Sequence, residues 1–288
     1  PRDRAREFSP GGRGGPGGSG VGGRELQVRV ITGAIVLAVL LLAAAIGPGA
    51  LAFLVTIALV MAAAELYQTF RTRGYHPATL LGLAATAALI GVIWWRPGQQ
   101  DLVLVLLLGF ALLWYLLGVS RARPLVNVAV TVFGFFYVGF LGSYAAAILK
   151  VFPNGVGILL GAILATAAYD TGAYFFGSWA GKTPLMPDIS PGKTVEGAGG
   201  GTFAALVMCI LIVRMITPWD GGKAFWLALV VSAAAPLGDL VESMLKRDLG
   251  VKDMGSLVRG HGGVLDRIDA LLFVAPATYF LARVLDMF

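Results

Sequence analysis

Charge is scarce in this chain, and so are the side chains most often used for acid–base and thiol chemistry. Only 13% of the 288 residues are charged, about half the share found in soluble domains, and the chain has two histidines and one cysteine. The low charge excludes an ordinary water-soluble enzyme, and the high apolar content excludes disorder for most of the chain. The single cysteine, Cys209, cannot form an intrachain disulfide, and with two histidines it cannot complete a usual zinc site.

Long apolar runs are what the chain has instead. Hydrophobic residues make up 57% of the sequence and the mean hydropathy is +0.81. A single spanning helix needs about 20 apolar residues. Nine runs approach that length: 30–46, 49–66, 79–95, 102–119, 126–148, 155–177, 197–216, 224–242 and 267–285. The sequence therefore predicts an all-α polytopic membrane protein with nine transmembrane helices.

The basic residues predict how these helices are oriented. If the N-terminus is cytoplasmic, 17 of the 22 lysines and arginines fall on the cytoplasmic side and five on the other. Lysine and arginine in short loops resist translocation, so this bias favours a cytoplasmic N-terminus and a C-terminus on the opposite side. We expect a multi-pass protein of the cell (plasma) membrane whose active site faces the cytoplasm.

The chain divides into three parts. Residues 1–29 are rich in glycine and arginine and have little apolar surface, which predicts a disordered, basic cytoplasmic tail. A nucleic-acid-binding arm is the alternative for this tail, but a basic tail also suits an anionic membrane surface, and we expect no nucleic-acid partner. Residues 30–150 are expected to hold helices 1–5, and residues 151–288 the catalytic helices 6–9 with their cytosolic loops.

Acidic residues within the spans point to a cation site. Asp170 and Asp239 each lie about 15 residues along a helix that runs towards the cytosol, while Asp266 and Asp269 begin the last, outward-running helix. Carboxylates at one depth repel one another unless a cation joins them, and oxygen-only ligands favour Mg²⁺. Simple intrahelical ion pairing is the alternative, and for Glu242 with Lys246 both interpretations remain open.

Two cytosolic loops supply basic and hydroxyl groups beside these acids. The last loop surrounds His261-Gly262-Gly263 with five basic residues: Lys246, Arg247, Lys252, Arg259 and Arg267. The preceding loop, 190–197, contains a lysine, hydroxyls and an acid, but Pro187 stands where a P-loop requires glycine. Anions are favoured at such a helix entrance. Together the residues indicate metal-assisted phosphoryl or nucleotidyl transfer on a lipid.

Two further features are given structural interpretations. Gly199-Gly200-Gly201 is typical of close helix packing. Glu65, placed near a cytosolic helix end, is expected to extend its carboxylate to the membrane surface.

The C-terminal motifs resemble those of a known family. Ser243-Met244-Leu245-Lys246-Arg247, then Lys252-Asp253, then the stretch from His261 to Asp269 resemble the signature of phosphatidate cytidylyltransferases, the CDP-diacylglycerol synthases. The segments 170–174 and 190–197 also resemble motifs of that family. The resemblance implies that CTP and phosphatidic acid react to give CDP-diacylglycerol and pyrophosphate with Mg²⁺, in phospholipid biosynthesis. A second, monovalent cation such as K⁺ and a homodimer are further expectations.

The resemblance also implies roles for individual residues. Metal binding is assigned to Asp239, Asp266, Asp269 and Asp170. Catalytic roles are assigned to Lys246, Arg247, Lys252, Asp253, His261, Arg267 and Asp269. Substrate binding is assigned to Ser190, Lys193, Thr194, Glu196, Ser243, Gly262 and Gly263.

Two other functions are weighed against this one. A CTP-dependent lipid kinase would need a base for a lipid hydroxyl, and the C-terminal motifs fit a cytidylyltransferase better. A cation-coupled transporter would also explain acids within spans, but it predicts broken helices at the middle of the bilayer, whereas these acids lie towards one edge.

Overall fold

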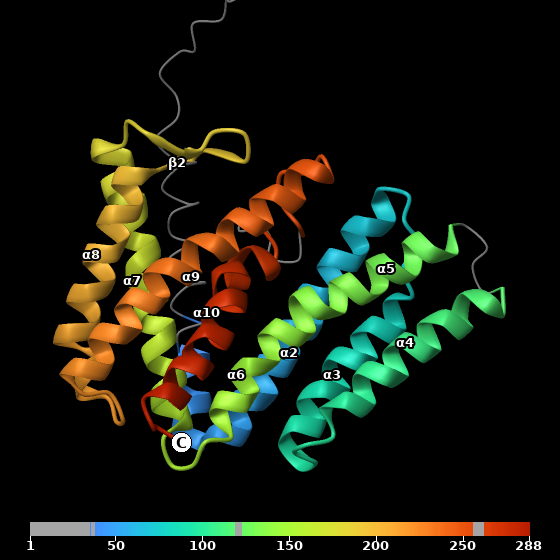
Figure 1. Cartoon of the computed structure of the whole chain (residues 1–288), viewed down its shortest axis with the longest axis horizontal. Helices are drawn as coiled ribbons and strands as arrows, with labels where there is room; N and C mark the ends of the chain where they lie inside the picture. The colour runs from blue at the N-terminus through green and yellow to red at the C-terminus, as the bar shows by residue number, and fades with distance from the viewer. Residues whose placement is uncertain (1–34, 36–37, 119–122, 256–261) are drawn as a thin grey trace, which may run out of the picture.

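The architecture is almost entirely helical (Figure 1). The computed structural model describes residues 35, 38–118, 123–255 and 262–288. The helices are α2 (Pro48–Thr72), α3 (Thr79–Trp95), α4 (Gln100–Leu116), α5 (Pro124–Gly134), α6 (Leu141–Leu149), α7 (Gly155–Ala180), α8 (Val195–Leu211), α9 (Gly221–Asp248) and α10 (Leu265–Val284). A π-helical segment, Phe135–Phe140, joins α5 to α6, and a 3-10 turn, Val213–Met215, follows α8.

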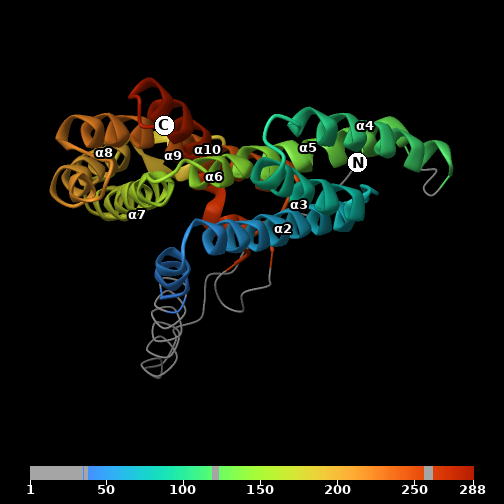
Figure 2. The same ribbon diagram turned by 90° about the horizontal axis from the view of Figure 1, so that it is seen from below.

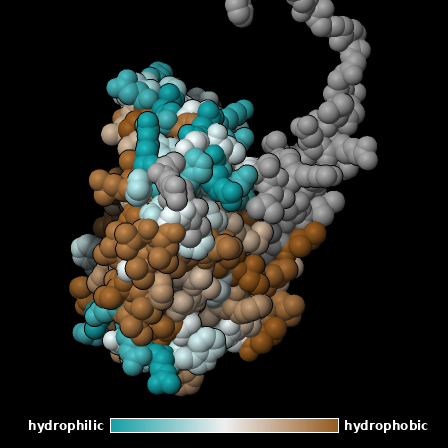
Figure 3. Space-filling model, turned by 90° about the vertical axis from the view of Figure 1, so that its right-hand side faces the viewer, coloured by the Kyte–Doolittle hydropathy of each residue, from teal (hydrophilic) through white to brown (hydrophobic). Residues whose placement is uncertain are grey.

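Most of the described helices have the length or the apolar composition of membrane spans. Five described segments are long and apolar enough to cross a membrane: α2, the continuous Pro124–Leu149, α7, α8 with its 3-10 turn, and α9. The shorter helices α3 and α4 are also apolar. Figure 3 shows a broad hydrophobic band across the middle of one face, with hydrophilic residues towards both ends. The prediction of an all-α, multi-pass membrane protein is confirmed.

The predicted runs coincide with these helices to within a few residues. The run 79–95 matches α3 at both ends, while α9 continues six residues beyond the predicted end at 242. The first run, 30–46, is described only at residues 35 and 38–46, which are helical. The tail predicted for 1–29 lies outside the described residues.

Successive helices run up and down, so the loops alternate between two ends of the molecule (Figure 1). Helices α2 to α6 form one side and α7 to α10 the other, with α10 between α9 and α6. In Figure 2, residues 38–46 project from the start of α2 at an angle to it, and Ala43 in this segment is buried against the core. The connection 181–194 and the described parts of the connection between α9 and α10, residues 249–255 and 262–264, lie at one end, and the C-terminus lies at the opposite end.

Glycines let the helices approach closely. A Cβ on Gly200 would lie 2.3 Å from the Phe176 Cβ, and one on Gly201 would lie 2.9 Å from the Tyr169 carbonyl oxygen, so α8 packs directly on α7. Gly199 has nothing within 4 Å, so the predicted packing role holds for two of the three glycines. On the other side of the molecule, the Tyr67 ring of α2 fills the space beside Gly82 of α3 and Gly134 of α5.

A short β-hairpin between α7 and α8 departs from the prediction of a loop. Strands β1 (Pro184–Met186) and β2 (Ser190–Thr194) pair antiparallel. The sequence does not predict these strands, because proline is normally depleted in strands and this segment contains three prolines, Pro184, Pro187 and Pro191. The Thr194 hydroxyl oxygen accepts the Gly197 amide at 3.1 Å, so the hairpin ends by capping α8.

Candidate active site

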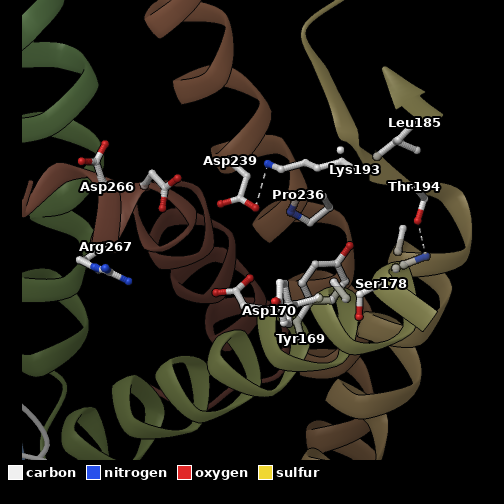
Figure 4. Close-up of a pocket in the computed structure, with 17 residues that line it drawn as sticks. Tyr169, Asp170, Ser178, Leu185, Lys193, Thr194, Pro236, Asp239, Asp266 and Arg267 are labelled. Carbon is white, nitrogen blue, oxygen red and sulfur yellow. Dashed lines mark hydrogen bonds and ion pairs between the residues drawn. The ribbon is translucent and has the colours of Figure 1, made fainter. Parts of the chain in front are cut away.

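A pocket of about 480 Å³ lies where the hairpin meets the helices of the C-terminal half (Figure 4). Side chains and backbone from α7, β1, β2, α8, α9 and α10 enclose it. Its lining combines carboxylates with cations and hydroxyls; those of its residues used below are Asp170, Ser178, Lys193, Thr194, Asp239, Asp266, Arg267 and Asp269.

Four aspartates from three helices line this pocket. Asp170 comes from α7, Asp239 from α9, and Asp266 and Asp269 from the first turns of α10. Figure 4 shows the carboxylates of Asp170 and Asp239 directed into the same space. Asp269 is only 8% exposed, and one of its oxygens accepts the Ala270 amide at 2.8 Å. The pocket therefore concentrates negative charge at the end of a largely apolar helix bundle.

Two lysines partly neutralise these aspartates. The Lys193 Nζ on β2 lies 2.9 Å from the Asp239 Oδ2, which connects the hairpin to α9. The Lys246 Nζ lies 2.7 Å from the Asp266 Oδ1 and 2.6 Å from the Glu242 Oε2, so it joins α9 to α10. The intrahelical pair of Glu242 with Lys246 thus forms, but Lys246 also reaches the aspartate of another helix.

Backbone amides hold Asp266 in place. Its Oδ1 accepts the Met254 amide at 3.2 Å and its Oδ2 accepts the Gly263 amide at 2.6 Å. Gly262 has a φ of +79°, and a Cβ there would lie 2.8 Å from the Asp266 Oδ2, so glycine suits this position on both counts. The end of the connection between α9 and α10 wraps around the Asp266 carboxylate.

The structure brings some of the predicted site residues together and leaves others outside the pocket. Lining the pocket are Asp170, Lys193, Thr194, Asp239, Asp266, Arg267 and Asp269. Lys246, Gly262 and Gly263 contact Asp266. The described pocket lining does not include Ser190, Glu196, Ser243, Arg247, Lys252 and Asp253. His261 lies outside the described residues.

Two of the residues outside the lining hold the hairpin. The Glu196 carboxylate accepts the amides of Lys182 and Thr183, both at 3.1 Å, and so fixes the chain just before β1. The Arg247 Nε donates a hydrogen bond to the Ile189 carbonyl oxygen at the hairpin turn. Both contacts position the strand that carries Lys193.

The expectation for Glu65 is wrong. Its side chain does not reach the membrane surface, because Glu65 is 3% exposed and its Oε2 accepts the Leu265 amide of α10 at 2.9 Å. Its partner is 200 residues away in the sequence, so local patterns do not reveal the contact. Two features of the sequence do indicate a buried contact. A charged residue inside an apolar span carries a high free-energy cost unless it is paired, and Thr69 lies one turn further along the same face of the helix.

The acidic side chains that line the pocket are all aspartates, which offer carboxylate oxygens. Such oxygen donors suit a hard cation such as Mg²⁺. Within the described ranges, however, no three acidic, histidine or cysteine side chains are clustered closely enough to form a closed metal site. The four aspartates instead surround a shared space. This arrangement fits an ion that keeps several waters and also binds substrate phosphates, as Mg²⁺ usually does.

Fold and site together define a multi-pass membrane protein with a carboxylate- and lysine-lined pocket at one end of its helices. Residues 27–285 match the cytidylyltransferase family, and the chain belongs to that family. The resemblance noted in the C-terminal motifs is therefore confirmed.

Curated relatives match most of the chain. A phosphatidate cytidylyltransferase of Bacillus subtilis is 32% identical over 267 residues, covering 89% of this chain and 97% of the relative. One of Mycobacterium bovis is 31% identical over 287 residues, covering 91% and 90%. One of Synechocystis is 32% identical over 253 residues, covering 77% and 84%.

Proposed function

We propose that this chain is a phosphatidate cytidylyltransferase that makes CDP-diacylglycerol and pyrophosphate from CTP and phosphatidate in the pocket described above. Family membership and the near full-length relatives of that name support the activity. The main support for placing the activity in this pocket is that four aspartates, Lys193 and Arg267 converge on it from four elements, α7, β2, α9 and α10. A lipid phosphate and a water-soluble nucleotide can meet there.

The chemistry suits a pocket whose described lining has no histidine. A phosphate oxygen of phosphatidate attacks the α-phosphorus of CTP, a new P–O–P bond forms, and the bond from the α-phosphorus to the β-phosphate oxygen breaks. The attacking oxygen is already anionic, so no base needs to remove a proton. The demands on the protein are positioning and charge neutralisation, which account for most of the catalysis in phosphoryl-type transfers.

The cations in and beside the pocket would bind the phosphates. Lys193 and Lys246 exchange their aspartate contacts for phosphate oxygens when substrate enters, and Arg267 reaches the same space. Such fixed positive groups stabilise the charge that develops on pyrophosphate. Lys252, Asp253 and His261 keep the catalytic roles, and Ser190 and Ser243 the substrate-binding roles, that the resemblance to the family implies.

Asp239, Asp266 and Asp269, with Asp170, would hold Mg²⁺ against the CTP phosphates. When bound, Mg²⁺ polarises phosphate oxygens and neutralises negative charge. A monovalent ion such as K⁺ and assembly as a homodimer are part of the proposal. So is the division into a tail, helices 1–5 and catalytic helices 6–9.

The orientation is also part of the proposal. We place the pocket end at the cytoplasm, with nine spans, a cytoplasmic N-terminus and the C-terminus on the other side. The hairpin and the C-terminus lie at opposite ends in Figure 1, which supports this arrangement. Phosphatidate then enters sideways from the inner leaflet, while CTP arrives from the cytosol.

An assay of the purified protein in detergent tests the activity. The protein is incubated with phosphatidate, Mg²⁺ and CTP labelled at the α-phosphate. Label in the lipid together with released pyrophosphate is the expected result. Release of CDP would identify a lipid kinase, and no turnover with cation uptake in vesicles would identify a transporter.

Asp239→Asn tests the site itself. The carboxylate lines the pocket and pairs with Lys193, so we expect its loss to lower kcat by about 10²- to 10³-fold, the usual effect of removing one electrostatic group from an active site. Asp101→Asn, on the exposed first turn of α4, is the matched control and should retain full activity. Equal activity in both variants would remove Asp239 from the site.

A further inference from the structure

Helix α2, in the N-terminal half, contacts the connection between α9 and α10 and the first residue of α10 through two buried polar side chains. Glu65 is 3% exposed and Thr69 is 7% exposed, and they lie one turn apart on the same face of α2. The Glu65 Oε2 accepts the Leu265 amide at 2.9 Å, and the Thr69 hydroxyl donates to the Met254 carbonyl oxygen at 2.7 Å. We call Glu65 and Thr69 the α2 polar pair.

Glu65 performs the capping role that α10 lacks at its own N-cap position. The N-cap residue of α10 is Val264, whose apolar side chain cannot accept a hydrogen bond. The first amides of a helix need acceptors, and a carboxylate is favoured there by the helix dipole. Because Leu265 is the first residue of α10, the Glu65 carboxylate satisfies one of these amides from another helix.

Two glycines make room for this carboxylate. A Cβ on Gly255 would lie 2.4 Å from the Glu65 Cδ, and a Cβ on Gly263 would lie 2.4 Å from its Oε2. The chain on both sides of the connection therefore packs directly against Glu65. A third contact comes from Arg73, the C-cap residue of α2, whose Nη2 donates to the Gly250 carbonyl oxygen at 2.6 Å and holds the start of the same connection.

The two residues bound by the α2 polar pair are both connected to Asp266, one by a hydrogen bond and the other as its neighbour in the chain. Met254, whose carbonyl oxygen binds Thr69, gives its amide to Asp266. Leu265, whose amide binds Glu65, directly precedes Asp266. Groups that orient a catalytic or metal-binding carboxylate affect the metal affinity of the site and the reaction rate without contacting the substrate.

We propose that Glu65, with Thr69, is a positioning residue that sets the place of Asp266 and the start of α10 in the active site. This inference rests on the proposed function for its effect on turnover. It assigns a catalytic consequence to the N-terminal half, which supplies no side chain to the described pocket lining.

The test compares Glu65→Ala, Glu65→Gln and Thr69→Val with Gln68→Ala, an exposed position on the same helix. Two measurements need no turnover: hydrogen exchange of the amides at 254–255 and 262–266, and Mn²⁺ binding by electron paramagnetic resonance. For Glu65→Ala we expect faster exchange confined to those amides and Mn²⁺ affinity weakened by about 10-fold, the lower range for losing an orienting group. Glu65→Gln should retain part of the protection from exchange and part of the Mn²⁺ affinity, since its amide oxygen can still accept a hydrogen bond from the Leu265 amide.

Activity gives the second readout. The Mg²⁺ concentration for half-maximal rate should rise and kcat should fall in Glu65→Ala, while Gln68→Ala should match the wild type. Wild-type exchange and wild-type Mn²⁺ affinity in Glu65→Ala would overturn the proposal. If Glu65→Ala does not fold, Glu65→Gln and Thr69→Val decide, and wild-type Mn²⁺ binding and Mg²⁺ dependence in both would overturn it.

The two proposals can fail separately. Absence of cytidylyl transfer in the wild type would refute the proposed function, while exchange and Mn²⁺ binding would still report on the α2 polar pair.

Discussion

Lys193 and Asp239 form an ion pair that neither the strand nor the helix that carries them would predict on its own. Lys193 lies on a short strand and Asp239 in the middle of a long helix, yet their charged atoms are 2.9 Å apart. Both side chains are about 30% exposed, so the ion pair adds little to the free energy of unfolding. A pair that contributes little to stability and lines a pocket is available to bind substrate.

Lys193→Ala should therefore reduce activity without reducing stability. We expect kcat/KM for CTP to fall by about 10²-fold, because a preorganised cation for the phosphates is lost, with an unchanged melting temperature in detergent. Lys193→Arg should recover part of the rate. Lys182→Ala, an exposed lysine just before the hairpin, is the control; an equal loss in Lys182→Ala would show that the effect is only nonspecific surface charge.

At the scale of elements, apolar periodicity and turn residues predicted the helices well but not the hairpin. The run 79–95 matches α3 because Pro77 and Pro97-Gly98 bound it. Helix α9 extends to Asp248, and Lys246 within this polar stretch pairs with both Glu242 and Asp266, so a stretch that resembles a loop remains helical. The hairpin is held by contacts from Glu196 and Arg247, which no local pattern reveals.

The adjacent glycines of α8 allow a direct test of helix packing. Gly200→Ala places a Cβ 2.3 Å from the Phe176 Cβ of α7, so we expect a loss of about 1–3 kcal/mol in the free energy of unfolding, as for other overpacked interiors. Gly199→Ala has open space, and alanine's better helix propensity predicts a gain of up to about 1 kcal/mol. Thermal unfolding of both variants in the same detergent measures the difference. Equal melting temperatures would show that α7 and α8 can separate to admit the extra methyl group.

For the whole molecule, the sequence predicts that acidic residues converge towards one end of the bundle, but it does not predict the contact between the two halves. Asp170, Asp239 and Asp266 were expected at one depth because helix length fixes how far each lies along its span. The sequence does not reveal the burial of Glu65, because that burial depends on how α2 packs against the start of α10, 200 residues away. Depth follows from local geometry, whereas lateral neighbours follow from tertiary packing.

The orientation of the whole molecule can be measured with single cysteines. The native Cys209 is fully buried, so a Cys209→Ala background leaves no reactive thiol. In it, Asp188→Cys at the hairpin turn and Gln99→Cys between α3 and α4 place exposed thiols at opposite ends. Because the basic residues gather at the hairpin end, we expect a membrane-impermeant maleimide to label Gln99→Cys in intact cells. Asp188→Cys should react only after permeabilisation. The reverse pattern would place the pocket on the outer face, where cytosolic CTP could not reach it, and would contradict the proposed orientation.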